Sequence, residues 1–126
     1  MRVSIETRYS DYDPGGHVNN ACYVTYFEMA RGRAWVEAMG MPPEFPFVVS
    51  EALVRYVRQA RLGDPLDVEV TTTDVREKSW LLRYRVLDRR DDRLIAYGHT
   101  VQVMFDYATQ QSVEIPAELR AKLAAV

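Results

Sequence analysis

The chain has little of three things that would each point to a particular class of protein: cysteine, long apolar runs and an excess of one charge. Cys22 is the only cysteine among 126 residues, which excludes a disulfide within the chain and suits a reducing compartment. No stretch of about 18 apolar residues is present, and the first residues lack a signal peptide's apolar core. The net charge of −2 gives no general attraction to nucleic acid or anionic membranes. We therefore expect a soluble, cytoplasmic protein without a membrane span or a nucleic-acid partner.

The residues that are present suffice for one folded domain. Hydrophobic residues make up 48% of the chain. A chain of this size can form a core that removes about two thirds of the unfolded surface from water. The sequence has no internal repeat, low-complexity tract or inter-domain linker. We therefore expect residues 1–126 to form a single domain.

One long helix is predicted near the start of the chain. Apolar residues recur at helical spacing between residues 20 and 39, and Gly40, followed by Pro42 and Pro43, gives a stop signal. The first half of this segment is apolar on nearly every side, which is typical of a helix buried inside a fold.

Five segments have strand character, and a short terminal helix is expected to open at Ile115. The strands are residues 2–10, 47–61, 66–76, 79–87 and 94–107. In the last of them we expect one apolar face to cover the core, made of Ile95, Tyr97, His99, Val101, Val103 and Phe105. Short connections indicate an antiparallel sheet. The predicted fold class is therefore α+β, with a five-stranded antiparallel sheet wrapped around one long central helix. Its long edge strands favour pairing with a second subunit.

Residues 9–23 read Y-S-D-Y-D-P-G-G-H-V-N-N-A-C-Y, just at the start of the predicted helix. The chain must reverse at residues 14–16, whereas Asn19 and Asn20 lie where a helix N-terminus leaves backbone N–H groups unpaired. A carboxylate at Asp13 that faces such donors can attack a carbonyl, or activate water against it, while the donors hold the carbonyl oxygen. The stretch therefore indicates an acyl-transfer site.

The segment D-Y-D-P-G-G-H-V-N-N-A-C-Y, followed by Y-F-E-M-A-R, resembles the D-x-D-x-x-G-x-V signature of hotdog-fold thioesterases of the 4-hydroxybenzoyl-CoA type. That family includes the Tol-Pal-associated acyl-CoA thioesterases. The resemblance implies a hotdog fold and hydrolysis of an acyl-CoA or acyl-carrier-protein thioester. It implies no metal and no cofactor apart from the coenzyme A of the substrate. It also implies a homodimer with paired sites at the interface, often doubled into a homotetramer.

The resemblance assigns roles to five residues of the polar stretch. Asp13 matches the catalytic carboxylate, described as a nucleophile or general base, and Gly16 matches the glycine of the turn. Asn20 falls where the helix N-terminus presents a backbone N–H to the thioester carbonyl. Tyr9 matches a tyrosine that accompanies the carboxylate in the Tol-Pal-associated branch. His17 matches a histidine that has been given a role in plant acyl-carrier-protein and acyl-lipid thioesterases.

Substrate contacts are predicted in two further places. The turn from Arg76 through Lys78 and Ser79 resembles the basic turn that holds coenzyme A phosphates in the 4-hydroxybenzoyl branch. An apolar groove between helix and sheet, with Tyr23, Phe27 and Met29 in its wall, would take the acyl chain. Gln59 lies in a strand that brings a carboxylate near the site in the plant enzymes.

The sequence departs from each known branch at one position. Asn20 is a histidine or tyrosine in the better-known branches, and Gly15 stands where the plant enzymes have an asparagine. No branch therefore transfers its substrate to this chain, and both the acyl group and its carrier stay open.

Alternatives remain for several residues. Asp11 reads as a structural residue of the turn, and Cys22 as a packing residue rather than a thiol nucleophile. A hotdog hydratase or dehydratase would pair His17 with Glu28 or Asp13. A non-catalytic acyl-thioester binding protein would explain the groove and the dimer without needing a carboxylate.

Overall fold

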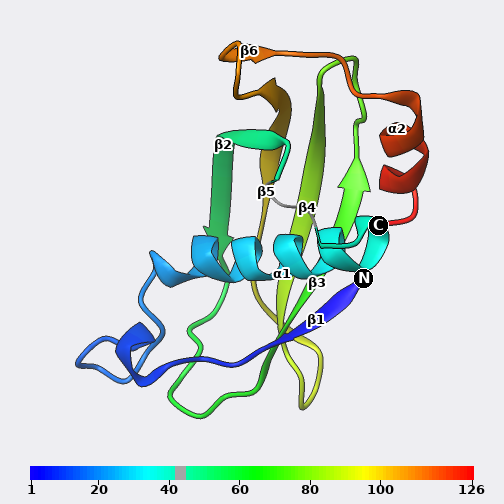
Figure 1. The fold of residues 1–126 in the computed structure, drawn as a ribbon. Coiled ribbons are helices and arrows are strands. Elements are labelled where there is room, and N and C mark those ends of the chain that lie inside the picture. The colour runs from blue at the N-terminus through cyan, green and yellow to red at the C-terminus, as the bar shows by residue number, and fades with distance from the viewer. Residues whose placement is uncertain (42–44) are drawn as a thin grey trace.

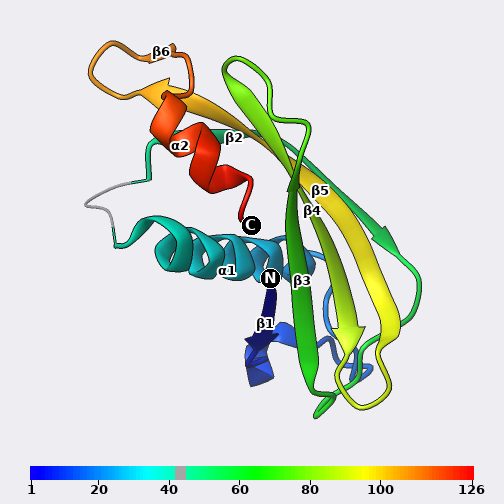
Figure 2. The ribbon, with the colours of Figure 1, turned by 90° about the vertical axis from the view of Figure 1, so that its right-hand side faces the viewer.

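A curved antiparallel sheet wraps around one long helix, α1 (Cys22–Met39), as Figures 1 and 2 show. The structure is a computed structural model that describes residues 1–41 and 45–126. Its strands are β1 (Arg2–Ile5), β2 (Phe47–Tyr56), β3 (Leu66–Thr73), β4 (Ser79–Asp88), β5 (Arg93–Asp106) and β6 (Gln111–Ser112). A 3-10 turn, η1 (Tyr9–Asp11), follows β1, and a short helix, α2 (Ala117–Leu123), lies near the C-terminus. The strand order is β1-β3-β4-β5-β2, with β6 paired to β5.

The predicted α+β class, with an antiparallel sheet around a long helix, is confirmed. The predicted number of five strands was wrong, because β6 adds a sixth. It pairs only two residues with the end of β5, which is too short for alternation to reveal. The chain also has α2 in addition to the central helix, near the position predicted for a terminal helix. No helix in the described ranges is long and apolar enough to cross a membrane.

The helix α1 fills the concave side of the sheet. Its buried side chains face the strands, and among them Phe27 stacks on Tyr84 of β4 with ring centroids 4.2 Å apart. The helix ends at Gly40, whose φ of 83° lies in the left-handed region that glycine adopts without a steric penalty. Pro42 and Pro43, the other part of the predicted stop signal, lie outside the described residues.

The predicted core face of β5 was wrong except at Ile95, which is buried in the core. The face toward α1 includes Gly98, Thr100 and Gln102, all buried, whereas the alternate residues around His99 face outward. The polar side chains are tolerated inside because they are paired. The Thr100 hydroxyl is 2.8 Å from that of Tyr84, and the Gln102 amide donates to the Trp80 carbonyl at 3.2 Å. On this strand, hydrogen bonds thus allow polar side chains to occupy the buried face.

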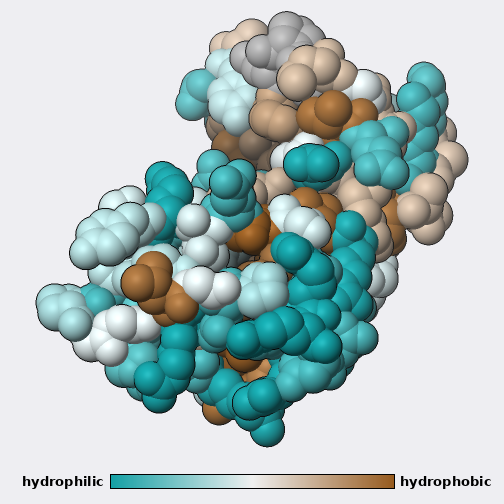
Figure 3. Space-filling view, turned by 90° about the horizontal axis from the view of Figure 1, so that it is seen from below, coloured by the Kyte–Doolittle hydropathy of each residue, from teal (hydrophilic) through white to brown (hydrophobic). Residues whose placement is uncertain are grey.

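Ion pairs fasten the end of the sheet at which the β2–β3 and β4–β5 connections lie. The carboxylate of Asp67 accepts hydrogen bonds from Arg2 and Arg89, both at 2.8 Å. The Arg90 guanidinium holds the pKa of Asp88 well below its usual range, at about 2. Seen from below, this end of the molecule is largely hydrophilic (Figure 3).

Gly98 provides a test of how closely β2 and β5 approach. A Cβ atom at this position would clash with the backbone carbonyl of Leu53, so Gly98→Ala should force the strands apart. We expect the free energy of unfolding to fall by about 1–3 kcal/mol, measured by urea titration. Gly32→Ala on α1 is the control. Its Cβ would meet nothing within 4 Å, and the added helix propensity should stabilise the fold. Equal effects of the two substitutions would contradict the packing.

Candidate active site

The loop between η1 and α1 folds back on itself around Asp13. The backbone N–H of Gly16 donates to the Asp13 carbonyl at 2.8 Å, and the N–H of Asp13 donates to the His17 carbonyl at 2.7 Å. Gly16 has a φ of 83°, which this tight reversal requires and which L side chains rarely adopt. The Pro-Gly-Gly sequence therefore gives the turn that was predicted from it.

The loop is attached to the segment that precedes β3. The N–H of Val18 donates to the Ala60 carbonyl at 2.8 Å, and the N–H of Leu62 donates to the Gly16 carbonyl at 3.0 Å. His17 and Arg61 form an isolated antiparallel bridge. These contacts fix the loop against the sheet at the end that Figure 1 shows at the bottom.

Asp11 is the buried anchor of the loop, with only 1% of its surface exposed. Its carboxylate accepts hydrogen bonds from the backbone N–H of Arg8 at 3.0 Å, from the Arg8 guanidinium at 2.9 Å and from the Tyr26 hydroxyl at 2.9 Å. Burial alone would raise the pKa of Asp11, but these hydrogen bonds outweigh it and hold the pKa below its ordinary value. Since Tyr26 belongs to α1, the carboxylate ties the loop to the helix.

A cavity of about 240 Å³ lies where the loop, the start of α1 and the end of β2 meet. It is lined by Asp13, His17, Val18, Asn20, Tyr23, Tyr56, Arg58 and Gln59. Four of the predicted site residues therefore share one cavity: Asp13, His17, Asn20 and Tyr23.

Two neighbouring asparagines shape this cavity in different ways. The Asn19 amide donates to the Asp13 carboxylate at 2.7 Å, and its oxygen accepts the backbone N–H of Ala21 at 2.9 Å. The Asn20 carbonyl accepts a hydrogen bond from the Tyr56 hydroxyl at 2.8 Å. The backbone N–H of Asn20 has no acceptor within residues 1–41 and 45–126. The exposed Asp13 and Asn20, whose N–H has no acceptor in the described ranges, thus line the same cavity.

Comparison with known proteins shows the family to which the chain belongs. The family model described as the thioesterase-like superfamily matches residues 7–123. The chain is 30% identical to the acyl-CoA thioester hydrolase YbgC of Escherichia coli O157:H7, over 97% of this chain and 94% of the relative. It is 28% identical to the long-chain acyl-CoA thioesterase FadM of Escherichia coli K12, over 98% and 96%.

A solved structure shares both fold and sequence with the chain. It is a thioesterase from Thermus thermophilus complexed with coenzyme A and Zn, with a TM-score of 0.87 and 31% identity over 98% of this chain and 92% of that one. The chain belongs to the thioesterase-like superfamily. The predictions of a hotdog fold and of a thioester hydrolase are thereby confirmed.

Several predicted site residues of this thioesterase lie outside the cavity of Asp13, among them Tyr9, Phe27 and Met29. Tyr9 projects from η1 with 86% of its surface exposed, and its catalytic role stays a prediction. Phe27 is fully buried in the core, whereas Met29 lines a second cavity. Tyr23, Phe27 and Met29 therefore do not form one groove in the single chain, because residues two apart on a helix point in different directions.

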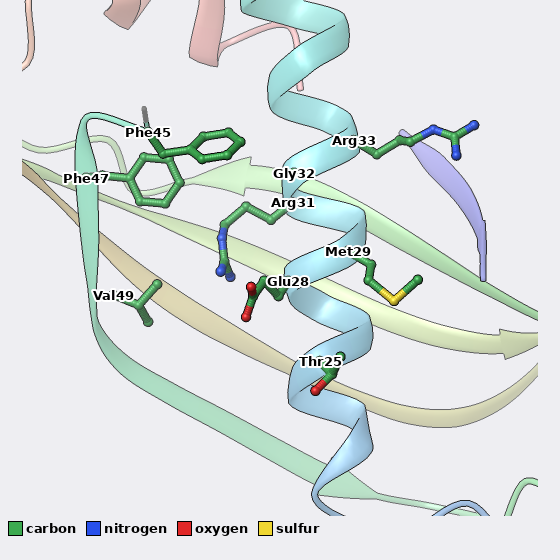
Figure 4. A pocket seen from close by; sticks show the side chains of 9 residues that line it. All are labelled: Thr25, Glu28, Met29, Arg31, Gly32, Arg33, Phe45, Phe47 and Val49. Carbon is green, nitrogen blue, oxygen red and sulfur yellow. The ribbon is translucent and has the colours of Figure 1, made fainter. Parts of the chain in front are cut away.

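The second cavity, of about 480 Å³, opens between α1 and β2 (Figure 4). Glu28 and Arg31 point toward β2 in this view, and Phe47 lies opposite them. The Arg31 guanidinium lies 5.9 Å from the centre of the Phe47 ring. Glu28 and His17 thus line different cavities, which disfavours their pairing in a hydratase.

The predicted phosphate-binding turn lies at the opposite end of the sheet from Asp13. Arg76, Lys78 and Ser79 stand in and directly after the β3–β4 turn, which Figure 1 shows at the top. The Ser79 carbonyl accepts the N–H of Arg76 at 2.8 Å, which closes the turn. The eight residues of β3 separate this turn from the loop of Asp13, which corresponds to about 26 Å of strand.

Cys22 packs behind the loop and does not line the cavity of Asp13. Burial raises the pKa of its thiol, and the nearby Asp11 raises it further. The thiol is therefore a poor nucleophile. No group of three or more metal-ligating side chains occurs within the described ranges.

Sequence reasoning missed Tyr56 and Arg58 as cavity residues and took Asn19 only as a helix cap. Tyr56 and Arg58 lie two residues apart at the end of β2, and only the fold brings them to the loop. A signal for Asn19 was present, since an amide beside a helix start has one oxygen to cap with and one nitrogen to donate from.

The role of Asp11 as an anchor predicts how stability depends on pH. Asp11→Asn should lower the free energy of unfolding at pH 7 by about 2 kcal/mol, because charged hydrogen bonds to Arg8 are lost. The pKa of Asp11 is depressed in the folded state, so its contribution is present above pH of about 4 and is lost as the pH falls through the folded pKa. Urea titrations of both proteins should therefore converge in acid.

Asp91→Asn is the control for this comparison. Asp91 forms an exposed pair with Arg93 at 2.8 Å, and its loss should change stability little. A difference between wild type and Asp11→Asn that stays constant down to low pH would contradict the anchor.

Proposed function

We propose that this thioesterase hydrolyses acyl-CoA thioesters at the cavity lined by Asp13 and Asn20. The observation that carries the proposal is that one cavity is lined both by the exposed Asp13 and by Asn20, whose backbone N–H has no acceptor in the described ranges. The names of YbgC and FadM, both acyl-CoA thioester hydrolases, support coenzyme A as the carrier. Acyl-carrier protein presents the same phosphopantetheine arm and is the alternative carrier.

The reaction follows from this arrangement. The Asn20 N–H donates to the thioester carbonyl oxygen and stabilises the negative charge that develops there. Asp13 then either attacks the carbonyl carbon to form a mixed anhydride, which water hydrolyses, or removes a proton from the attacking water. Both routes release the free acid and the thiol. Water is the only co-reactant, so no cofactor is needed. In this proposal His17, which lines the same cavity, exchanges a proton with the leaving thiolate.

A second subunit completes the substrate site in this proposal. β2 pairs only with β5, so within the described residues its other edge is free over ten residues. Such an edge favours pairing with a second copy. Because Asp13 and Arg76 lie at opposite ends of one sheet, the phosphates of a bound coenzyme A would meet the Arg76–Ser79 turn of another subunit. We therefore propose a homodimer or homotetramer, which acts in a reducing cytoplasm.

Asp13→Asn tests the chemistry. We expect kcat/KM to fall by a factor of about 100 or more, because the amide can neither attack nor accept a proton. Release of free thiol from a panel of aromatic and short-, medium- and long-chain acyl-CoA and acyl-carrier-protein substrates measures this. Asp91→Asn, the same chemical change in an exposed turn, should keep wild-type activity. Full turnover in Asp13→Asn would contradict the role of Asp13. Binding without any thiol release by the wild type would instead indicate a non-catalytic protein.

The basic turn is tested by the combined change Arg76→Ala and Lys78→Ala. We expect KM to rise several-fold for an acyl-CoA and to stay unchanged for the matching acyl-pantetheine, which lacks the nucleotide phosphates. Sedimentation of the same samples should give the mass of a dimer or tetramer. An unchanged KM for acyl-CoA would contradict the phosphate contact, and an active monomer would contradict the shared site.

A further inference from the structure

The Asn19 side chain joins the Asp13 carboxylate to the start of α1. Its oxygen accepts the backbone N–H of Ala21 at 2.9 Å, and its nitrogen donates to the Asp13 carboxylate at 2.7 Å. Since a backbone N–H can only be paired with an acceptor, the oxygen must face Ala21. The amide orientation is therefore fixed, and its N–H group must face Asp13.

The backbone of Asn19 is held as firmly as its side chain. Its N–H donates to the Asp11 carbonyl at 2.8 Å, and its carbonyl accepts the N–H of Cys22 at 3.0 Å. Asp11 is itself clamped by Arg8 and Tyr26. A continuous series of hydrogen bonds thus runs from the buried anchor through Asn19 to the carboxylate at the cavity.

We propose that Asn19 is a positioning residue, which sets the direction of the Asp13 carboxylate at the cavity. The proposal rests on the proposed function, in which Asp13 does the chemistry. The amide occupies one carboxylate oxygen, so the other oxygen is the one that meets the thioester or the water. A carboxylate without this partner would be free to rotate, and less of it would be correctly oriented for attack.

Other charged and titratable groups also face this carboxylate across the cavity. His17 lies on the same loop, Tyr23 on α1, Tyr56 on β2 and Arg58 just after it. Their positions do not depend on the Asn19 side chain. A substitution at Asn19 therefore changes one partner of Asp13 and leaves the rest of the cavity in place.

Asn19→Asp separates the two uses of this side chain. A carboxylate oxygen still accepts the N–H of Ala21, so the helix start is kept, but the donor to Asp13 is replaced by a like charge. Two adjacent carboxylates hold a proton more readily than one. We expect the acid limb of the kcat/KM profile to move to higher pH by about one unit or more. The unfolding transition, followed by tryptophan fluorescence, should stay close to that of the wild type.

Asn19→Ser removes the amide donor without adding charge. Its single, shorter hydroxyl can still accept the N–H of Ala21, but one atom cannot reach both Ala21 and Asp13 as the two amide atoms do. The kcat of this variant should fall by about tenfold with the acid limb in place, because only the orientation of Asp13 is lost. Ser10→Asp adds a charge to an exposed site outside the cavity lining and should leave the profile unchanged.

Two results would overturn the assignment in distinguishable ways. Wild-type rates and pH profiles in both Asn19 variants, with Asp13→Asn inactive, would remove the role of Asn19 and leave the proposed function standing. Full turnover in Asp13→Asn would remove the proposed function itself, and the assignment of Asn19 with it.

Discussion

The buried carboxylate of Asp11 is the contact on which the geometry of the site depends. It is held by the backbone and side chain of Arg8, which directly precedes η1, and by Tyr26 in the second turn of α1. The loop between these two elements therefore has both ends fixed. Without this contact, the turn at residues 14–16 would still reverse the chain, but only the bonds to residues 60–62 and those of Asn19 would hold it near the helix start. The placement of Asp13 is thus determined two residues before it.

The burial of α1 explains why the helix start is available for chemistry. A helix enclosed by the sheet buries its apolar side chains in the core, as Phe27 is buried against Tyr84. Its N-terminus emerges at the end of the sheet beside the loop, where Asn20 lines the cavity. The Asn20 N–H shares its peptide with the Asn19 carbonyl, which accepts the N–H of Cys22 at 3.0 Å. The next peptide is held from the side of β2, because its Asn20 carbonyl accepts the Tyr56 hydroxyl. The donor is therefore fixed in place by the fold before any substrate arrives.

The sequence predicted most of this arrangement where one local rule acted alone. The long helix, its end at Gly40 and the turn at residues 14–16 each followed from residue types with a single physical meaning. The core face of β5 could not be predicted in this way, because apolar residues occupy its outer face. The inner face accepts Gly98 for its close approach to β2, and accepts Thr100 because Tyr84 pairs with its hydroxyl. The alternation of apolar and polar residues along a strand reports only hydropathy, so it does not predict hydrogen bonds that side chains make between strands.

The candidate site likewise contains residues that the sequence predicts and residues that only the fold brings together. Asp13 and Asn20 are close in sequence and could be predicted together, whereas Tyr56 and Arg58 reach the cavity only through the pairing of β2 with β5. Asp11 and Asp13 illustrate how far environment separates two identical residue types. Asp11 is buried, and the hydrogen bonds to its carboxylate from the described part of the chain come from Arg8 and Tyr26, so its oxygens are already engaged. Asp13 is exposed and receives one side-chain hydrogen bond within the described residues, from Asn19. The first carboxylate therefore has a structural role, and the second is left exposed at the cavity, where the proposed function needs it.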